Sequence, residues 1–264
     1  MNDISTAPNI LELRSIRKEF GTIVALKGVS FTVGPSEIVG LVGDNGAGKS
    51  TLVKIIAGVH KASKGEMFFE GKRVVHNSPS EARDAGIETV FQDLALIEIF
   101  DVAENIFLGR EKLLGGFLGR LGFLRQRQMK AEAIAAIKEM GINLPGINSS
   151  KIGQLSGGQR QAVSIARAAF WQSKLLLLDE PTAALGVAET AEVERLVKRI
   201  TTDNKLGTLI ISHDMPQVSR MCDKVVVMRQ GHHVATLQGP HIDPEELVAF
   251  ITGAKSRQAE LVDA

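Results

Sequence analysis

The chain has 264 residues, of which 44% are hydrophobic and 23% charged, a composition that indicates a folded globular protein and excludes a disordered one. Its 31 basic and 30 acidic side chains give a formal net charge of +1, so overall charge does not favour nucleic acid as a partner. The single cysteine excludes an internal disulfide bond and fits a reducing compartment. The opening residues MNDISTAPNI predict no secretory signal, and no stretch approaches the ~20 apolar residues that span a bilayer.

The first ninety residues are expected to form mostly strands. Segments rich in β-branched and aromatic residues, bounded by glycine turns, carry that expectation. They are ILELRSIRKEF (10–20), VALKGVSFTV (24–33), EIVGLV (37–42), EMFFEGKRVV (66–75, a hairpin about Gly71) and IETVFQ (87–92). Between them, Leu52, Ile55, Ile56 and Val59 recur at helical spacing, which predicts a helix that begins near Lys49.

After Gln92 the pattern turns helical and then alternates. Two helices are expected, DVAENIFLGRE (101–111) and RQRQMKAEAIAAIKEMG (125–141), joined by the glycine-rich segment LLGGFLGRLGF (113–123). From Ser156 onward, helices and strands alternate. They are a helix from 156, strand 174–179, helix 187–200, strand 207–212, helix 215–222, and strands 223–229 and 232–238. Such alternation predicts a mostly parallel sheet covered by helices, here interrupted by a helical lobe.

A glycine-rich segment between a strand and a helix predicts a phosphate-binding loop. It reads GDNGAGKST and matches G-x-x-x-x-G-K-[ST]. Its residues are Gly43, Asp44, Asn45, Gly46, Ala47, Gly48, Lys49, Ser50 and Thr51. Lys49 is expected to reach the β- and γ-phosphates, and the Ser50 hydroxyl to ligate Mg²⁺. The alternative is a glycine turn that binds no ligand.

Two adjacent carboxylates end the apolar strand LLLLDEPT. Successive side chains of a strand point to opposite sides, so Asp179 and Glu180 are expected to do different work. Asp179 suits the Mg²⁺ shell, directly or through water, and Glu180 suits a base that polarises the attacking water. The alternative is a pair of solvated acids that opens a loop.

The segment LSGGQ predicts a second place where an anion binds. Ser156 and Gln159 form the S-x-x-Q pattern of a helix capping box. A cap does not require Gly157 and Gly158, whose missing side chains expose the backbone N–H groups to an incoming ligand.

Five segments in this order resemble the ATP-binding subunits of ABC transporters: GDNGAGKST, FQD with Gln92, LSGGQ, LLLLDEP, and ISHD with His213. ENIFLGRE and PTAALGV are most similar to the branch that imports monosaccharides such as ribose, xylose or fructose. The resemblance implies an α/β fold: a P-loop NTPase (RecA-like) core with a mostly parallel sheet, an N-terminal antiparallel β part and an inserted helical subdomain.

The resemblance also implies how the site works. Two subunits would pair head to tail, with each ATP on the phosphate loop of one copy and under Ser156, Gly157, Gly158 and Gln159 of the other. ATP would close the pair and hydrolysis would open it. Gln92 would contact Mg²⁺ or the attacking water, and His213 would touch the γ-phosphate and hold Glu180.

Two further positions follow from the same resemblance. Phe20 would stack on adenine, the alternative being an ordinary core aromatic. Gly186 stands in AALG, where many family members have an aspartate that couples the two sites.

The implied organisation is one nucleotide-binding domain, 1–264. It has a core at about 1–93 and 160–240, a helical lobe at about 94–159, and a C-terminal helix and tail at 241–264.

Expected partners are a second copy, membrane permease subunits near residues 92–110 and, indirectly, an external sugar-binding protein. The chain would then lie peripherally at the cytoplasmic face of the membrane. Alternatives are a soluble ABC ATPase of DNA repair or translation, and a non-hydrolytic regulator.

Overall fold

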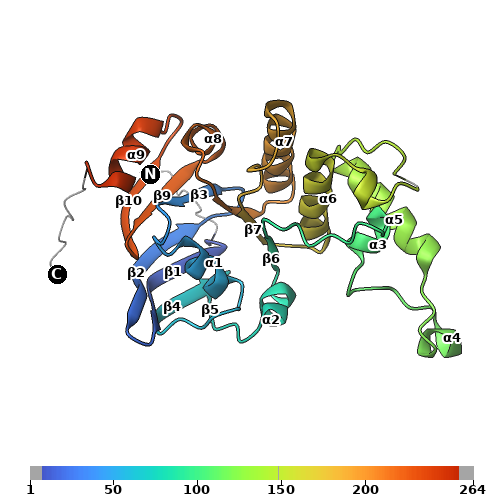
Figure 1. Cartoon of the computed structure of the whole chain (residues 1–264). Coiled ribbons are helices and arrows are strands. Elements are labelled where there is room, and N and C mark those ends of the chain that lie inside the picture. Colours follow the sequence, from blue (N-terminus) through green and yellow to red (C-terminus); the bar gives the residue numbers. More distant parts are fainter. Residues whose placement is uncertain (1–7, 148, 256–264) are drawn as a thin grey trace, which may run out of the picture. The chain divides into compact units, whose positions relative to one another are not determined.

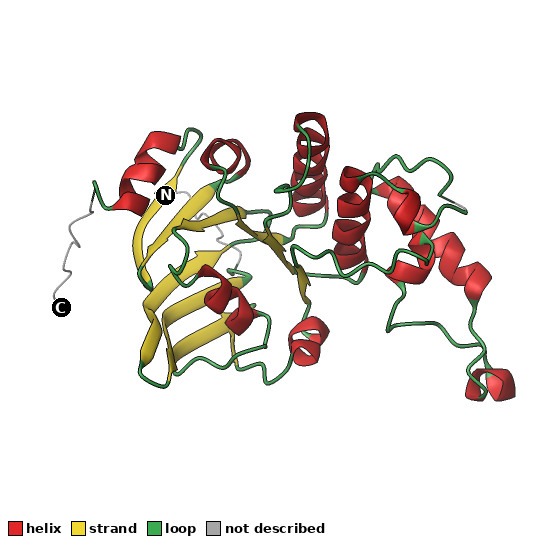
Figure 2. Cartoon of the chain, viewed as in Figure 1, coloured by secondary structure: helices red, strands yellow, loops and turns green. Residues whose placement is uncertain are grey.

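The computed structural model describes residues 8–147 and 149–255, and these form two compact units. The second unit comprises Val90–Ser173 and Pro181–Ile200, and the first takes the remaining described residues. The first unit holds nearly all strand residues, whereas the second is helical, as the colours of Figure 2 show. No helix among the described residues is long and apolar enough to cross a bilayer.

A four-stranded antiparallel sheet of order β2-β1-β4-β5 opens the first unit. Its strands are β1 (Leu11–Phe20), β2 (Ile23–Val33), β4 (Lys64–Phe69) and β5 (Lys72–Val74). Gly21 and Gly71 form the two tight turns at φ values of 58° and 74°. The expected strand pair and the hairpin about Gly71 are therefore confirmed.

A six-stranded sheet of order β10-β9-β3-β8-β7-β6 carries the core of the first unit. Its strands are β3 (Ile38–Gly43), β6 (Ile87–Val90), β7 (Leu175–Asp179), β8 (Gly207–Ile211), β9 (Lys224–Arg229) and β10 (His232–Gln238). Strands β9, β3, β8 and β7 run parallel, and β10 is antiparallel. The apolar runs of β3, β7 and β8 are buried throughout, which suits a sheet covered on both faces. The carboxyl ends of these parallel strands meet at one edge, where such folds bind ligands.

Four helices belong to the first unit: α1 (Lys49–Ile56), α2 (Pro79–Asp84), α8 (Met215–Met221) and α9 (Pro244–Thr252), labelled in Figure 1. Helix α1 buries Leu52, Ile55 and Ile56 against the strands, as its spacing predicts. It ends at Ile56, so the inclusion of Val59 in the helical face was wrong; this side chain is exposed. Helix α2 was not predicted, because its six residues bury only Ala82 and show no apolar period. The tail expected at the C-terminus lies outside the described residues beyond 255.

The second unit is built from α3 (Val102–Ile106), α4 (Gly116–Arg120), α5 (Gln126–Glu139), the 3₁₀ turn η1 (Ile152–Gln154), α6 (Gly157–Phe170) and most of α7 (Val187–Asp203). Phe107, Ile137 and Val163 lie fully buried in its own core. The glycine-rich joint 113–123 contains the short helix α4, which sequence reasoning missed because its apolar side chains stay exposed. This unit includes α6 and extends beyond 94–159; the functional boundaries given above remain predictions.

Candidate active site

The phosphate loop lies between β3 and α1 in the first unit. Gly43 ends β3 at φ 150°, where an added Cβ would come within 2.1 Å of the Met228 carbonyl oxygen. At Gly48, with φ 101°, a Cβ would lie 2.7 Å from a methyl of Leu26. A Cβ on Gly46, with φ 81°, would meet nothing within 4 Å. Packing therefore requires glycine at positions 43 and 48, whereas the space beside Gly46 is open to a ligand.

The N-terminus of α1 offers free donors to an anion. Gly48 is the N-cap residue, and no side chain caps the helix there. The first backbone N–H groups of a helix have no intrahelical partner, and the helix dipole favours negative charge at this end. Asp44, Asn45 and Ser50 are exposed, Thr51 is half-buried, and Ala47 is buried. The loop therefore presents backbone donors and the Ser50 hydroxyl at the surface of the unit.

Lys49 folds back over this loop. Its Nζ donates to the carbonyl oxygens of Gly43 at 2.6 Å and Asp44 at 3.1 Å. Burial lowers the pKa of Lys49, and the carboxylates of Glu180, Asp44 and Asp179 oppose that shift. The ammonium group is therefore half-buried beside three acids, and phosphate oxygens can take over the bonds that it makes to the loop carbonyls.

Asp179 and Glu180 lie at the carboxyl end of β7. Asp179 pairs with Ile211 of β8, and burial followed by the charge of Glu180 raises the pKa of Asp179. Lys49 and Lys54 oppose this shift. Glu180 has a φ of 51°, and its N–H donates to the Ile211 carbonyl at 3.0 Å. A left-handed conformation in a non-glycine residue is strained and is typical of functional positions.

His213 contacts Glu180 directly. Its Nδ1 lies 2.8 Å from Glu180 Oε2, within hydrogen-bond distance. The Glu180 side chain is 18% exposed and the His213 side chain 74% exposed. The two residues follow neighbouring parallel strands, β7 and β8, whose ends bring them together. The carboxylate is thus held by an imidazole that itself faces solvent.

The oxygen donors at this edge suit Mg²⁺. The ion prefers carboxylate, hydroxyl and water oxygens, and it is commonly shared with substrate phosphates. Asp179 and Ser50 supply a carboxylate and a hydroxyl. A cation would offset both causes of the raised pKa of Asp179, which are burial and the charge of Glu180. Within residues 8–147 and 149–255 no group of three or more His, Cys, Asp or Glu side chains could hold a metal.

Phe20 ends β1 and is 43% exposed, so it is not a core aromatic. Its ring meets that of His60 edge to face at 5.3 Å between centroids, and Lys18 Nζ lies 4.8 Å from its centre. The exposed ring can stack on a base, and that role remains a prediction.

Gln92 and the LSGGQ segment (residues 155–159) belong to the second unit. Gln92 lies in an exposed turn after β6. At α6 the capping box is present: the Gln159 N–H donates to Ser156 Oγ at 3.3 Å, and the Ser156 N–H donates to Gln159 Oε1 at 3.0 Å.

Sequence reasoning missed Glu189 of α7. Ser156 Oγ donates to Glu189 Oε1 at 2.9 Å, and the Gly158 N–H donates to the same oxygen at 3.3 Å. An acid in the first turn of a predicted helix is an ordinary capping signal. Nothing in the local sequence indicates that this acid reaches a second helix.

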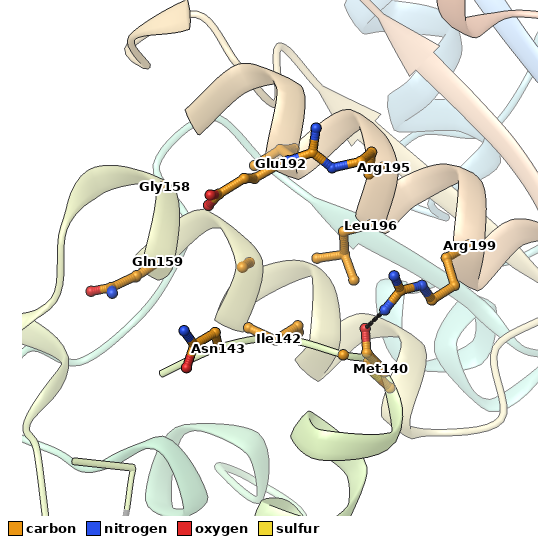
Figure 3. Close-up of a pocket in the computed structure, with 12 residues that line it drawn as sticks. Met140, Ile142, Asn143, Gly158, Gln159, Glu192, Arg195, Leu196 and Arg199 are labelled. Atoms are coloured by element: carbon orange, nitrogen blue, oxygen red, sulfur yellow. Dashed lines mark hydrogen bonds between the residues drawn. The ribbon is translucent and has the colours of Figure 1, made fainter. Parts of the chain in front are cut away.

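A cavity of about 230 Å³ flanks this contact within the second unit. Figure 3 shows Met140, Ile142 and Asn143, which follow α5, facing Leu196 and Arg199 of α7, and Arg199 Nη1 donates to the Met140 carbonyl at 3.0 Å. Gly158, Gln159 and Glu192 also line the cavity. Open space therefore lies beside the N-terminal turn of α6.

Comparison with known proteins identifies relatives. A family model described as "ABC transporter" matches residues 26–183. The xylose/arabinose import ATP-binding protein XylG of Sulfolobus acidocaldarius is 43% identical, over 92% of this chain and 94% of the relative. The fructose import ATP-binding protein FrcA of Rhizobium meliloti is 40% identical, over 97% of this chain and 98% of the relative.

Solved structures of the same kind superpose on the chain. The ADP conformation of MJ1267, an ATP-binding cassette of an ABC transporter, gives a TM-score of 0.76 at 28% identity, with 92% of this chain and 95% of the other covered. A dimeric post-hydrolysis state of the ATP-binding cassette MJ0796, bound to ADP and phosphate, gives 0.68 at 25% identity, with 86% and 98% covered. The fold class expected from the sequence is thereby confirmed.

Proposed function

The chain belongs to the ABC transporter family, and we propose that it is the ATP-hydrolysing motor subunit of a monosaccharide importer. The contact between His213 and Glu180, whose charge acts on Lys49 of the phosphate loop, carries the proposal. Similarity to import proteins for xylose/arabinose and fructose over nearly the whole chain supports the sugar class.

ATP would bind with its phosphates on residues 43–51 and its adenine on Phe20. Backbone N–H groups at the start of α1 would hold the phosphate oxygens, and Lys49 would transfer its bonds from the loop carbonyls to the β- and γ-phosphates. Mg²⁺ held by Ser50, Asp179 and Gln92 would neutralise charge on the phosphates.

Glu180 would act as the general base. Its carboxylate orients a water molecule and accepts a proton as the water oxygen bonds to the γ-phosphorus. The bond from the γ-phosphorus to the bridging oxygen then breaks, leaving ADP and phosphate. His213 would fix the Glu180 carboxylate and touch the γ-phosphate, while Gln92 would contact Mg²⁺ or the attacking water.

The site would be completed by a second copy. Ser156, Gly157, Gly158 and Gln159 of the partner subunit would cover the γ-phosphate, so ATP closes a head-to-tail pair and hydrolysis reopens it. The dimeric MJ0796 structure supports pairing of such cassettes. A homodimer is the expected form.

The pair would pass its motion to permease subunits near residues 92–110, at the cytoplasmic face of the membrane, with an external sugar-binding protein completing the system. The functional division into a core (about 1–93 and 160–240), a lobe (about 94–159) and a C-terminal part (241–264) belongs to this proposal. Nucleic acid has no part in it.

Glu180→Gln tests the proposal. The amide keeps the shape of the side chain but cannot accept the proton, so we expect retained ATP binding, turnover reduced at least about 100-fold, and an ATP-stabilised dimer in light scattering. Glu66→Gln, which changes a half-buried acid of β4 in the same unit that pairs with Arg73, should leave turnover unchanged. Unchanged hydrolysis in the Glu180→Gln protein would remove Glu180 from this role.

A further inference from the structure

The carboxylate of Glu189 lies where the LSGGQ segment would hold a phosphate. It accepts hydrogen bonds from Ser156 Oγ at 2.9 Å and from the Gly158 N–H at 3.3 Å. A Cβ on Gly158 would lie 2.9 Å from the Cβ of Glu189, so glycine at this position lets the acid approach. Both donors and the acceptor belong to the second unit.

Glu189 also contacts the start of its own helix. The Gly186 N–H donates to Glu189 Oε2 at 3.4 Å, so one carboxylate bridges the N-termini of α6 and α7. Hydrogen bonds from Ser156, Gly158 and Gly186, in that order, lower the pKa of Glu189. The negative charge is stabilised there as any anion at a helix N-terminus would be.

Capping alone does not account for this arrangement. The capping box between Ser156 and Gln159 already provides partners for the N–H groups of both residues. Glu189 takes two further donors at the tip of α6, the Ser156 hydroxyl and the Gly158 N–H. These are the groups that an incoming anion would need.

We propose that Glu189 is a resident anion that occupies the phosphate position of the LSGGQ segment in the unpaired chain. The inference rests on the proposed function, in which the partner's ATP presents its γ-phosphate to this segment. Two donors cannot serve a carboxylate and a phosphate at once, and the two negative charges repel each other. Pairing therefore displaces Glu189, and the residue sets the ATP concentration at which two copies close.

The test measures that concentration in a chain that binds ATP without hydrolysing it. In the Glu180→Gln background, ATP is titrated against the dimer fraction in analytical ultracentrifugation. Glu189→Gln keeps the shape but removes the charge, and we expect the midpoint ATP concentration to fall roughly three- to tenfold. Glu189→Ala should lower it at least as far. Glu192→Gln, the same charge change one turn along α7, should leave it within about twofold.

A second readout separates this role from helix capping. Weaker bonds from Ser156 and Gly158, and the lost bond from Gly186, should lower the Tm of Glu189→Gln. A merely destabilised chain would pair less readily. Tighter pairing together with a lower Tm identifies the resident anion. A midpoint that is unchanged or higher overturns the inference while the proposed function stands. If the Glu180→Gln chain never pairs at any ATP concentration, the proposed function fails and the inference fails with it.

Discussion

His213 Nδ1 lies 2.8 Å from Glu180 Oε2, although 33 positions separate these residues along the chain. The pairing of β7 with β8 produces the contact, because the two parallel strands end at the same edge of the sheet. The imidazole restrains a carboxylate whose backbone is already held in a left-handed conformation. Substitution of the histidine should therefore affect turnover more than nucleotide binding.

His213→Ala is expected to lower kcat by roughly 10²- to 10³-fold, since the general base loses the group that orients it. ATP affinity should change by less than about threefold, because the phosphate loop supplies most of the binding donors. Single-turnover hydrolysis and fluorescent-nucleotide titration separate the two effects. His232→Ala, an exposed histidine of β10, is the matched control. Equal losses in binding and turnover would contradict the role assigned to His213.

Lys49→Ala should weaken ATP binding at least about tenfold, because a charge-assisted contact to the phosphates is lost. Lys54→Ala changes an exposed lysine of the same helix and should bind ATP almost normally. Isothermal titration calorimetry measures both proteins. Equal affinities of the two variants would show that the Lys49 side chain does not reach the phosphates.

Gly48 and Gly46 of the phosphate loop should differ in how much their substitution by alanine destabilises the fold. Gly48→Ala would place a Cβ against Leu26 and the Ala25 carbonyl, so it should destabilise the fold by roughly 2–4 kcal/mol. Gly46→Ala meets no atom within 4 Å, and only its φ of 81° costs energy, about 1 kcal/mol. Urea denaturation measures the free energy of unfolding of both variants and should show this difference. Equal loss of stability in both variants would contradict the packing argument.

Asp179 should make stability depend on pH. Its folded-state pKa is raised by burial and by Glu180. Asp179 therefore contributes fully to the free energy of unfolding at pH values below its ordinary pKa. This contribution is lost as the pH rises through the raised pKa of the folded state. At neutral pH without nucleotide, Asp179→Asn should raise Tm by roughly 2–4 °C, and the difference should shrink at acidic pH. Asp84→Asn, an exposed acid at the end of α2, is the control. A lower Tm for Asp179→Asn at neutral pH would contradict the burial argument.

Local sequence patterns predicted most of the fold. Alternating and continuous apolar runs predicted the strands of both sheets, and the change of period at Lys49 predicted α1. Helices α2 and α4 were missed because neither buries an apolar face, so the hydrophobic pattern contained no signal for them.

Local sequence patterns likewise predicted some residues of the site and missed others. The glycine loop, Asp179, Glu180 and the capping box of Ser156 follow from residue types at fixed spacing, whereas His213 was identified only through family resemblance. Glu189 could not be found by either route. Its role depends on α7 packing beside the tip of α6, a tertiary contact between residues more than thirty positions apart.

Mixing two inactive variants shows whether each catalytic pocket takes half of its groups from a second copy. Lys49→Ala spoils the phosphate loop, and Ser156→Arg spoils the LSGGQ segment. A mixed head-to-tail pair contains one pocket built from the two intact halves, so random pairing should restore about a quarter of wild-type ATP hydrolysis. A mixture no more active than the average of its two components, or full activity in Ser156→Arg alone, would contradict a pocket shared between two copies.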